Sequence, residues 1–235
     1  MEIKGFVDIS FSDWDGIISS VIFLPSCNLR CPFCYNKSLV LSPEKMPAIP
    51  QEKVENYLQN NRKWIDGVVI TGGEPSLHHD LPLLCKKMKE IDFKVKVDTN
   101  GTNPVMISKL IEKGFVDFVA LDLKAPFTEG EYSEACGVNA APFLEKIRET
   151  VGILLSDVVE YEFRTTVVPN IHQTEDIKKI CKAVKGCKKY ALQNFKSDVE
   201  TIDSRYQNFK PFSQAEMEFF LRVAKPFVSN VVLRG

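Results

Sequence analysis

Short apolar runs alternate along the chain with longer stretches whose apolar positions fall on one helical face. Strands are predicted for residues 21–24, 67–71, 94–98, 115–123, 159–168 and 189–195. Helices are predicted for residues 52–64, 81–91, 104–113, 142–155 and 174–184. Buried strands that alternate with amphipathic helices are typical of a parallel sheet covered by helices, so the pattern predicts an α/β fold.

The count gives about six β/α units, which is fewer than the eight of a complete barrel. Right-handed crossovers close such units either into a partial barrel or into a doubly wound sheet, and the count does not decide between the two. Residues 6–11 are predicted to form an edge strand, and residues 128–139 an irregular insertion. We expect a single domain over residues 1–235, with a core at about 17–195 and a C-terminal helix and strand within 196–235.

Polar side chains gather where the predicted strands end. In chain order they are Cys27, Cys31 and Cys34, then Gly72-Gly73-Glu74, Asp98-Thr99-Asn100, Asp122 with Lys124, Arg164 within its strand, and Gln193-Asn194. The carboxyl ends of parallel strands meet at one edge of the sheet, where the sites of α/β folds lie. Each group also has a purely structural explanation, such as a tight turn at the glycines, an Asx turn at Asp98 or an Asp122–Lys124 pair.

Three of the seven cysteines fall within eight residues, at Cys27, Cys31 and Cys34. Clustered thiolates select zinc, copper(I) or an iron–sulfur cluster. A structural zinc needs a fourth ligand, and the sequence offers no second cysteine pair or histidine nearby. A [4Fe–4S] cluster normally takes four cysteines, so three would leave one iron open to a small molecule. A zinc-binding interaction module remains the alternative.

The spacing C-x3-C-x2-C, with Phe33 directly before the last cysteine, resembles the signature of the radical S-adenosylmethionine (radical SAM) superfamily. The resemblance implies a partial (β/α)6 barrel and one [4Fe–4S] cluster bound by Cys27, Cys31 and Cys34. It also implies that SAM chelates the open iron and is cleaved by the reduced cluster to a 5′-deoxyadenosyl radical. Gly72, Gly73 and Glu74 are similar to the family's GGE motif, which binds the SAM amino group. Glycines let a backbone approach a ligand, and a carboxylate accepts hydrogen bonds from an ammonium group.

Three further motifs, VDTNG at 97–101, DLK at 122–124 and RTTVVP at 164–169, resemble those of glycyl-radical-enzyme activating enzymes. The resemblance implies cofactor-binding roles beside SAM for Phe33, Tyr35, Asp98, Thr99, Asn100, Asp122, Lys124 and Arg164. In that family the equivalents of Asp98, Thr99 and Asp122 help to hold a monovalent cation beside the SAM carboxylate. The resemblance also implies that the backbone at the position of Tyr35 contacts adenine.

The size of the chain and its ending VVLRG resemble the compact activating proteins of anaerobic ribonucleoside-triphosphate reductase. This likeness implies a glycyl radical enzyme as the partner, anaerobic ribonucleotide reductase in particular, and flavodoxin or ferredoxin as the electron donor. A radical SAM enzyme that acts on a small molecule, of the 7-carboxy-7-deazaguanine synthase type, is the alternative within the superfamily.

Composition and charge indicate which partners and which compartment to expect. The chain has 235 residues with 30 basic and 31 acidic side chains, a balance that argues against nucleic acid or an anionic membrane as a partner. We expect a cytoplasmic protein, because residues 1–16 do not form a signal peptide and no apolar stretch reaches the ~20 residues of a membrane span. Four cysteines lie outside the triplet and do not cluster, so a single iron–sulfur cluster is predicted; they are Cys85, Cys136, Cys181 and Cys187.

Overall fold

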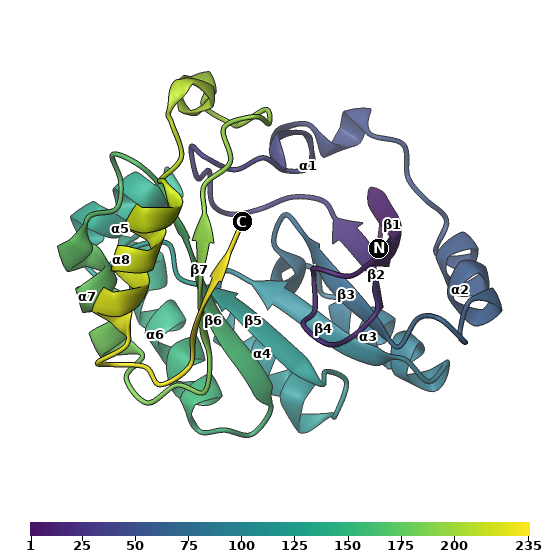
Figure 1. Ribbon diagram of the computed structural model, residues 1–235. Coiled ribbons are helices and arrows are strands. Elements are labelled where there is room, and N and C mark those ends of the chain that lie inside the picture. Colours follow the sequence, from purple (N-terminus) through teal and green to yellow (C-terminus); the bar gives the residue numbers. More distant parts are fainter.

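The computed structural model describes residues 1–235 and contains one eight-stranded sheet. The strands lie side by side in chain order (Figure 1), and every neighbouring pair is parallel except β1 and β2. Their bounds are β1 (Gly5–Ser10), β2 (Ser19–Leu24), β3 (Gly67–Gly72), β4 (Lys94–Thr99), β5 (Phe118–Asp122), β6 (Glu160–Val167), β7 (Tyr190–Asn194) and β8 (Val231–Arg234).

The sequential strand order decides between the two architectures that the sequence left open. In a doubly wound sheet the order reverses at a switch point, whereas here each strand pairs with the one that precedes it. The strands β2 to β7 are the six predicted units, with β1 at one edge of the sheet and β8 at the other. The fold is therefore the predicted partial (β/α)6 barrel, open between β1 and β8.

Helices cover the outer face of the sheet (Figure 1). They are α1 (Lys37–Leu41), α2 (Gln51–Asn60), α3 (Leu81–Glu90), α4 (Pro104–Glu112), α5 (Glu129–Cys136), α6 (Ala141–Leu155), α7 (Thr174–Ala183) and α8 (Gln214–Ala224), with 3₁₀ turns η1 (Pro43–Lys45), η2 (Pro75–Leu77) and η3 (Ser204–Asn208). Side chains alternate along each strand, so Val95 and Val97 of β4 belong to the main hydrophobic cluster while Lys96 and Asp98 do not. None of the helices is both long and apolar enough to cross a membrane.

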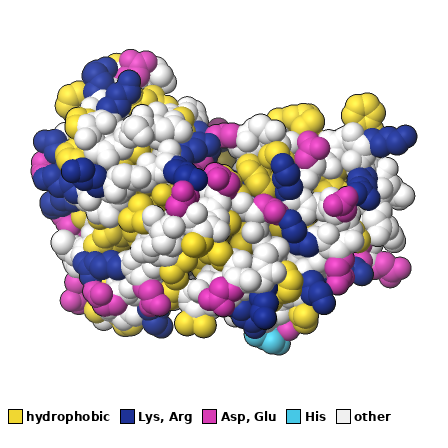
Figure 2. All heavy atoms as spheres, turned by 90° about the horizontal axis from the view of Figure 1, so that it is seen from below, with side chains coloured by type: hydrophobic (Ala, Val, Ile, Leu, Met, Phe, Trp, Pro, Cys, Tyr) yellow, Lys and Arg dark blue, Asp and Glu magenta, His cyan; other side chains and the backbone are white.

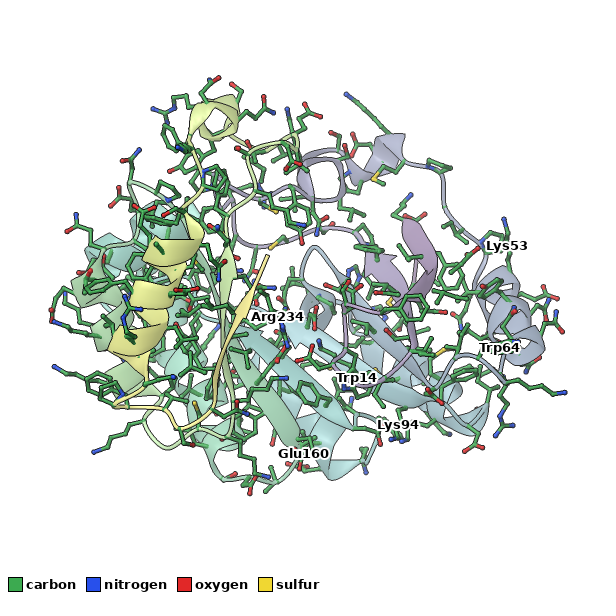
Figure 3. All side chains as sticks on the ribbon, viewed as in Figure 1. Trp14, Lys53, Trp64, Lys94, Glu160 and Arg234 are labelled. Carbon is green, nitrogen blue, oxygen red and sulfur yellow. The ribbon has the colours of Figure 1, made fainter.

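The loop between β1 and β2 joins the first strands to the last ones. Trp14 packs with Val21 and Val69 in a separate small apolar cluster. The Asp15 carboxylate pairs with Lys189 Nζ at 2.5 Å and with Arg234 Nη2 at 2.7 Å, which ties this loop to the end of the chain. Figure 3 shows Trp14 and Arg234 near one another over the sheet. Seen from below, basic and acidic side chains are interspersed around patches of apolar atoms (Figure 2).

Residues 128–139 are not the irregular insertion that the sequence predicted, because they contain helix α5. Its start is fixed by Thr128, whose side-chain oxygen accepts a hydrogen bond from the backbone N–H of Glu131. Its end is fixed by Gly137, which adopts a left-handed conformation with φ +69°. The prediction was wrong because these two capping residues flank a segment with little amphipathic pattern.

Candidate functional site

The cysteine loop, residues 27–34, follows β2 and is held by backbone hydrogen bonds from distant segments. The backbone N–H of Arg30 donates to the carbonyl of Cys136 at the end of α5, over 2.8 Å. On its other side the loop accepts bonds from the N–H groups of Ile202 and Asp203, at 3.0 and 2.9 Å. Figure 1 shows the segment after β7 beside the chain between β2 and α1. The loop is therefore clamped by the second half of the chain.

All three thiols of the cysteine loop are free, and Cys31 is the most buried, with 8% of its surface exposed. Burial raises the pKa of Cys27 to about 11 and that of Cys31 to about 12. The backbone N–H of Leu29 points at Cys27 Sγ over 3.4 Å, a contact that stabilises a thiolate. The thiols are protonated at neutral pH, so metal binding must release their protons.

The donor chemistry of the cysteine loop fits an iron–sulfur cluster. Its three thiols lie close enough that the charges of Cys27 and Cys34 raise the pKa of Cys31, although burial is the larger cause. No three His, Cys, Asp or Glu side chains within residues 1–235 stand at metal-binding distance as they are arranged. In a [4Fe–4S] cluster each cysteine binds a different iron, so its ligands need not meet at the distance that a single metal ion requires.

The glycines after β3 are required by packing of the backbone. A Cβ atom on Gly72, where φ is +121°, would lie 2.4 Å from the carbonyl oxygen of Leu24. A Cβ on Gly73 would lie 1.8 Å from the carbonyl oxygen of Ser26. Only glycine allows the end of β3 to lie this close to the start of the cysteine loop. This first role is structural, and contact of the same glycines with SAM remains a prediction.

Glu74 is fully enclosed, with 1% of its surface exposed, and both carboxylate oxygens face the protein. It accepts hydrogen bonds from the backbone N–H and the hydroxyl of Ser76, at 3.0 and 2.5 Å. It also accepts them from Thr99 Oγ1 at 2.7 Å and from the backbone N–H of Asn100 at 2.6 Å. Burial raises the pKa of Glu74, and these four donors oppose that shift. In this arrangement Glu74 joins the ends of β3 and β4.

We expect Glu74→Gln to lower the free energy of unfolding by about 1–3 kcal/mol, because an amide NH₂ would face donors that now meet an acceptor. Urea unfolding of the metal-free protein measures the change. The exposed Glu44 has no such partners, and Glu44→Gln should change the free energy of unfolding by less than about 0.5 kcal/mol. Equal stability of Glu74→Gln and the parent protein would contradict this account of the carboxylate.

A chain of buried and partly buried charges crosses the ends of β4, β5 and β6. Arg164 Nη1 lies 3.1 Å from Asp98 Oδ2, and Arg164 Nε lies 2.7 Å from Asp122 Oδ1. Lys124 Nζ lies 3.1 Å from the other oxygen of Asp122. Burial alone would raise the pKa of Asp122, but Arg164 and Lys124 outweigh it and hold that pKa well below its usual range. Arg164 does not reach the surface, since only 9% of it is exposed.

Asp98, Thr99 and Asp122, the residues implied as cation ligands, lie at one edge of the sheet. Each of them already pairs with another side chain. The guanidinium of Arg164 lies between the carboxylates of Asp98 and Asp122, while the hydroxyl of Thr99 is bonded to Glu74. Asp98 Oδ1 is buried and has no hydrogen-bond partner. A monovalent cation would therefore have to compete with Arg164 for at least one carboxylate, and Asp98 Oδ1 already lies 3.5 Å from the ammonium of Lys96.

Several residues of this rim were not singled out from the sequence. The amide of Asn28 in the cysteine loop donates to Thr102 Oγ1 at 2.8 Å and accepts from Asn100 Nδ2 at 2.9 Å. It thereby connects the cysteine loop to the turn after β4. An amide side chain between two ligand cysteines was the only signal available. Of the two predicted aromatic residues, Phe33 packs against Tyr206 with ring centroids 6.4 Å apart, whereas Tyr35 is 66% exposed.

Comparison with known proteins shows to which family the chain belongs. Residues 21–183 match the model of the radical SAM superfamily, which is more than half of the chain. The chain belongs to the radical SAM superfamily. Membership implies a [4Fe–4S] cluster and SAM as cofactors, and it identifies the chain as a radical SAM enzyme. The zinc-binding interaction module loses its support, because the cysteine loop lies within the matched residues.

Among relatives of this radical SAM enzyme, a protein of Methanocaldococcus jannaschii is 34% identical over 99% of this chain and 95% of its own length. It is named provisionally as a glycyl-radical enzyme activating enzyme. The 7-carboxy-7-deazaguanine synthase of Rickettsia prowazekii is 44% identical, but over only 37% of each chain. Streptococcus suis SuiB bound to S-adenosylmethionine superimposes with a TM-score of 0.69 at 17% identity, over 92% of this chain and 52% of SuiB. That likeness confirms the fold.

Proposed function

We propose that this enzyme uses a [4Fe–4S] cluster and SAM to install a glycyl radical on a partner enzyme, and that the partner is anaerobic ribonucleoside-triphosphate reductase. The observation that carries the proposal is the relative of nearly equal length that is named as an activating enzyme of this type. Further support comes from the three motifs of that class, because VDTNG, DLK and RTTVVP meet at one edge of the sheet. The specific partner rests on the chain's size and C-terminal sequence alone.

In this proposal Cys27, Cys31 and Cys34 are the cluster ligands. When bound, the cluster and SAM supply the 5′-deoxyadenosyl radical that removes a hydrogen atom from a glycine Cα. The ammonium of Lys124, which lies 3.1 Å from Asp122 Oδ2, is assigned to the SAM carboxylate.

The remaining predicted contacts are assigned supporting roles. Gly72, Gly73 and Glu74 hold the end of β3 against the cysteine loop, and Thr99 and Asn100 complete the enclosure of Glu74. The backbone of the exposed Tyr35 is assigned to contact with the adenine. The buried Phe33 is assigned to packing of the cysteine loop. The monovalent cation belongs to the proposal only if SAM draws Arg164 away from Asp98 or Asp122.

The proposed chemistry requires an electron donor, a reducing compartment and a route of entry for the partner. Reduction of the cluster is assigned to flavodoxin or ferredoxin, and a reducing cytoplasm suits seven cysteines that are all free. A loop of the partner would enter beside the exposed Tyr35, at the carboxyl ends of the strands. Water is kept from the buried charges by enclosure, because Arg164 and Glu74 are both buried.

The test is direct. Protein reconstituted without oxygen is mixed with SAM, a chemical reductant and an anaerobic ribonucleotide reductase, and the expected result is the EPR doublet of a glycyl radical together with 5′-deoxyadenosine. Formation of 5′-deoxyadenosine without any protein radical would reject this partner.

A second function within the superfamily is favoured by one observation, the 44% identity to a 7-carboxy-7-deazaguanine synthase over part of the chain. Such an enzyme would cleave SAM in response to a small molecule related to deazaguanine, with no partner protein present. Titration of SAM cleavage against candidate small molecules distinguishes this function from the activation of a partner.

A further inference from the structure

Helix α5 contacts both halves of the proposed site, through one backbone carbonyl and one side chain. The carbonyl of Cys136, at the C-terminal end of α5, accepts the backbone N–H of Arg30 in the cysteine loop, over 2.8 Å. The hydroxyl oxygen of Tyr132 accepts the backbone N–H of Lys124, just beyond β5, over 3.3 Å. One helix therefore bonds to the cysteine loop and to the segment that carries Lys124.

Gly137 ends α5 directly against the cysteine loop. Its φ is +69°, and a Cβ at this position would lie 2.0 Å from the carbonyl oxygen of Arg30 and 2.7 Å from the carbonyl carbon. Both atoms belong to the backbone, so no side chain could rotate to make room. Any larger residue would have to move either the helix end or the cysteine loop.

The helix and the segment beyond β5 are themselves fixed in place. Glu131 of α5 pairs with Lys179 of α7 at 2.5 Å. The carbonyl of Lys124 accepts a hydrogen bond from His172 Nε2 at 2.8 Å, because His172 Nδ1 already accepts the backbone N–H of Val168 at 3.0 Å. Burial lowers the pKa of His172, which favours this neutral form. The backbone of Lys124 is thus fixed at two atoms: its N–H bonds to Tyr132 and its carbonyl bonds to His172.

We propose that α5 positions the cysteine loop relative to the Asp122–Lys124 end of β5, and that Gly137 is the positioning residue at the contact. Both contacts are made by residues of one helix, which is a rigid element, so the two contacted segments are held in a fixed relation to one another. Gly137 touches neither the cluster nor SAM in this account and acts through Arg30. The inference rests on the proposed cluster and SAM site and adds a residue to it.

The test compares Gly137→Ala with Gly114→Ala. Gly114 also has a left-handed conformation, with φ +63°, at the end of α4, but a Cβ there would meet nothing within 4 Å. Both variants carry the same backbone strain, and only Gly137→Ala presses on the cysteine loop. In the metal-free protein we expect the Arg30 amide to exchange with solvent about tenfold faster in Gly137→Ala, and unchanged in Gly114→Ala.

The reconstituted protein gives an independent measurement. Gly137→Ala should hold less iron per chain than Gly114→Ala, and its reduced cluster should show an altered EPR spectrum on addition of SAM. A Gly137→Ala protein with the iron content, EPR spectrum and Arg30 exchange rate of the control would overturn the proposal. Loss of iron in both variants alike would also overturn it, because strain alone would then be the cause.

A second variant serves if Gly137→Ala does not fold. Tyr132→Phe keeps the ring, which stacks on Phe127 with centroids 6.0 Å apart, and removes only the acceptor for the Lys124 N–H. We expect full iron content with SAM bound about fivefold more weakly, equivalent to one hydrogen bond. Unchanged SAM affinity would reject the role of α5. Failure of the unsubstituted protein to bind iron and SAM would instead reject the proposed function.

Discussion

Replacement of Cys31 by alanine is expected to abolish the brown iron–sulfur chromophore, its EPR signal and SAM cleavage, while the protein remains folded. Cys31 is the central thiol of the loop, and two thiolates cannot retain a [4Fe–4S] cluster that is already one cysteine short. The fold should survive, since the change removes one sulfur atom from a site clamped by backbone bonds. We expect the free energy of unfolding to fall by only about 1 kcal/mol in the metal-free protein.

The matched control is Cys85→Ala. Cys85 is also buried, but it lies in α3 within the hydrophobic cluster and outside the cysteine loop. This variant should bind a full complement of iron and cleave SAM at the rate of the parent protein. Iron analysis, absorbance and the yield of 5′-deoxyadenosine measure both variants. Retention of the cluster by Cys31→Ala, or equal loss in Cys85→Ala, would exclude the cysteine loop as the cluster site.

The positions of the site residues could be predicted because they depend on strand ends. Cys27, Glu74, Asp98 and Asp122 each follow or end an apolar run, and parallel pairing in chain order brings such ends to one edge. Periodicity and turn residues therefore contain enough information to place them. The same local signals predicted about six β/α units but did not decide between a partial barrel and a doubly wound sheet, and the partial barrel was implied only by the family resemblance.

The partners of these residues could not be predicted, because they depend on contacts between distant segments. Asp122 pairs with Arg164 because their strands adopt a register that sets the two residues side by side. Glu74 turns toward the end of β4 because donors from Thr99 and Asn100 meet it there. Helix α5 was missed because its segment has little amphipathic pattern, and the contact of Gly137 with the cysteine loop joins segments that are distant in the sequence. Neither register nor rotamer is encoded in the local pattern.

Arg164→Met is expected to lower the free energy of unfolding by about 1–3 kcal/mol, because it removes the guanidinium that Asp98 and Asp122 share. Each carboxylate keeps one lysine, since Lys96 Nζ lies 3.5 Å from Asp98 and Lys124 Nζ lies 3.1 Å from Asp122. Urea unfolding of the metal-free protein measures the loss. Arg62 supplies the control, since its pair with Asp92 is exposed and Arg62→Met should cost less than about 1 kcal/mol.

The same variant should change the pH dependence of stability in a defined direction. In the parent protein the depressed pKa of Asp122 contributes stability at neutral pH, and this contribution is lost as the pH falls below about 4, where the unfolded chain takes up protons. Without Arg164 the pKa of Asp122 rises toward its unfolded value, so this acid-labile contribution shrinks and stability changes less between neutral and acidic pH. Circular dichroism at fixed urea across this range gives the slope. A slope as steep as that of the parent protein would show that Arg164 is not what holds Asp122 ionised.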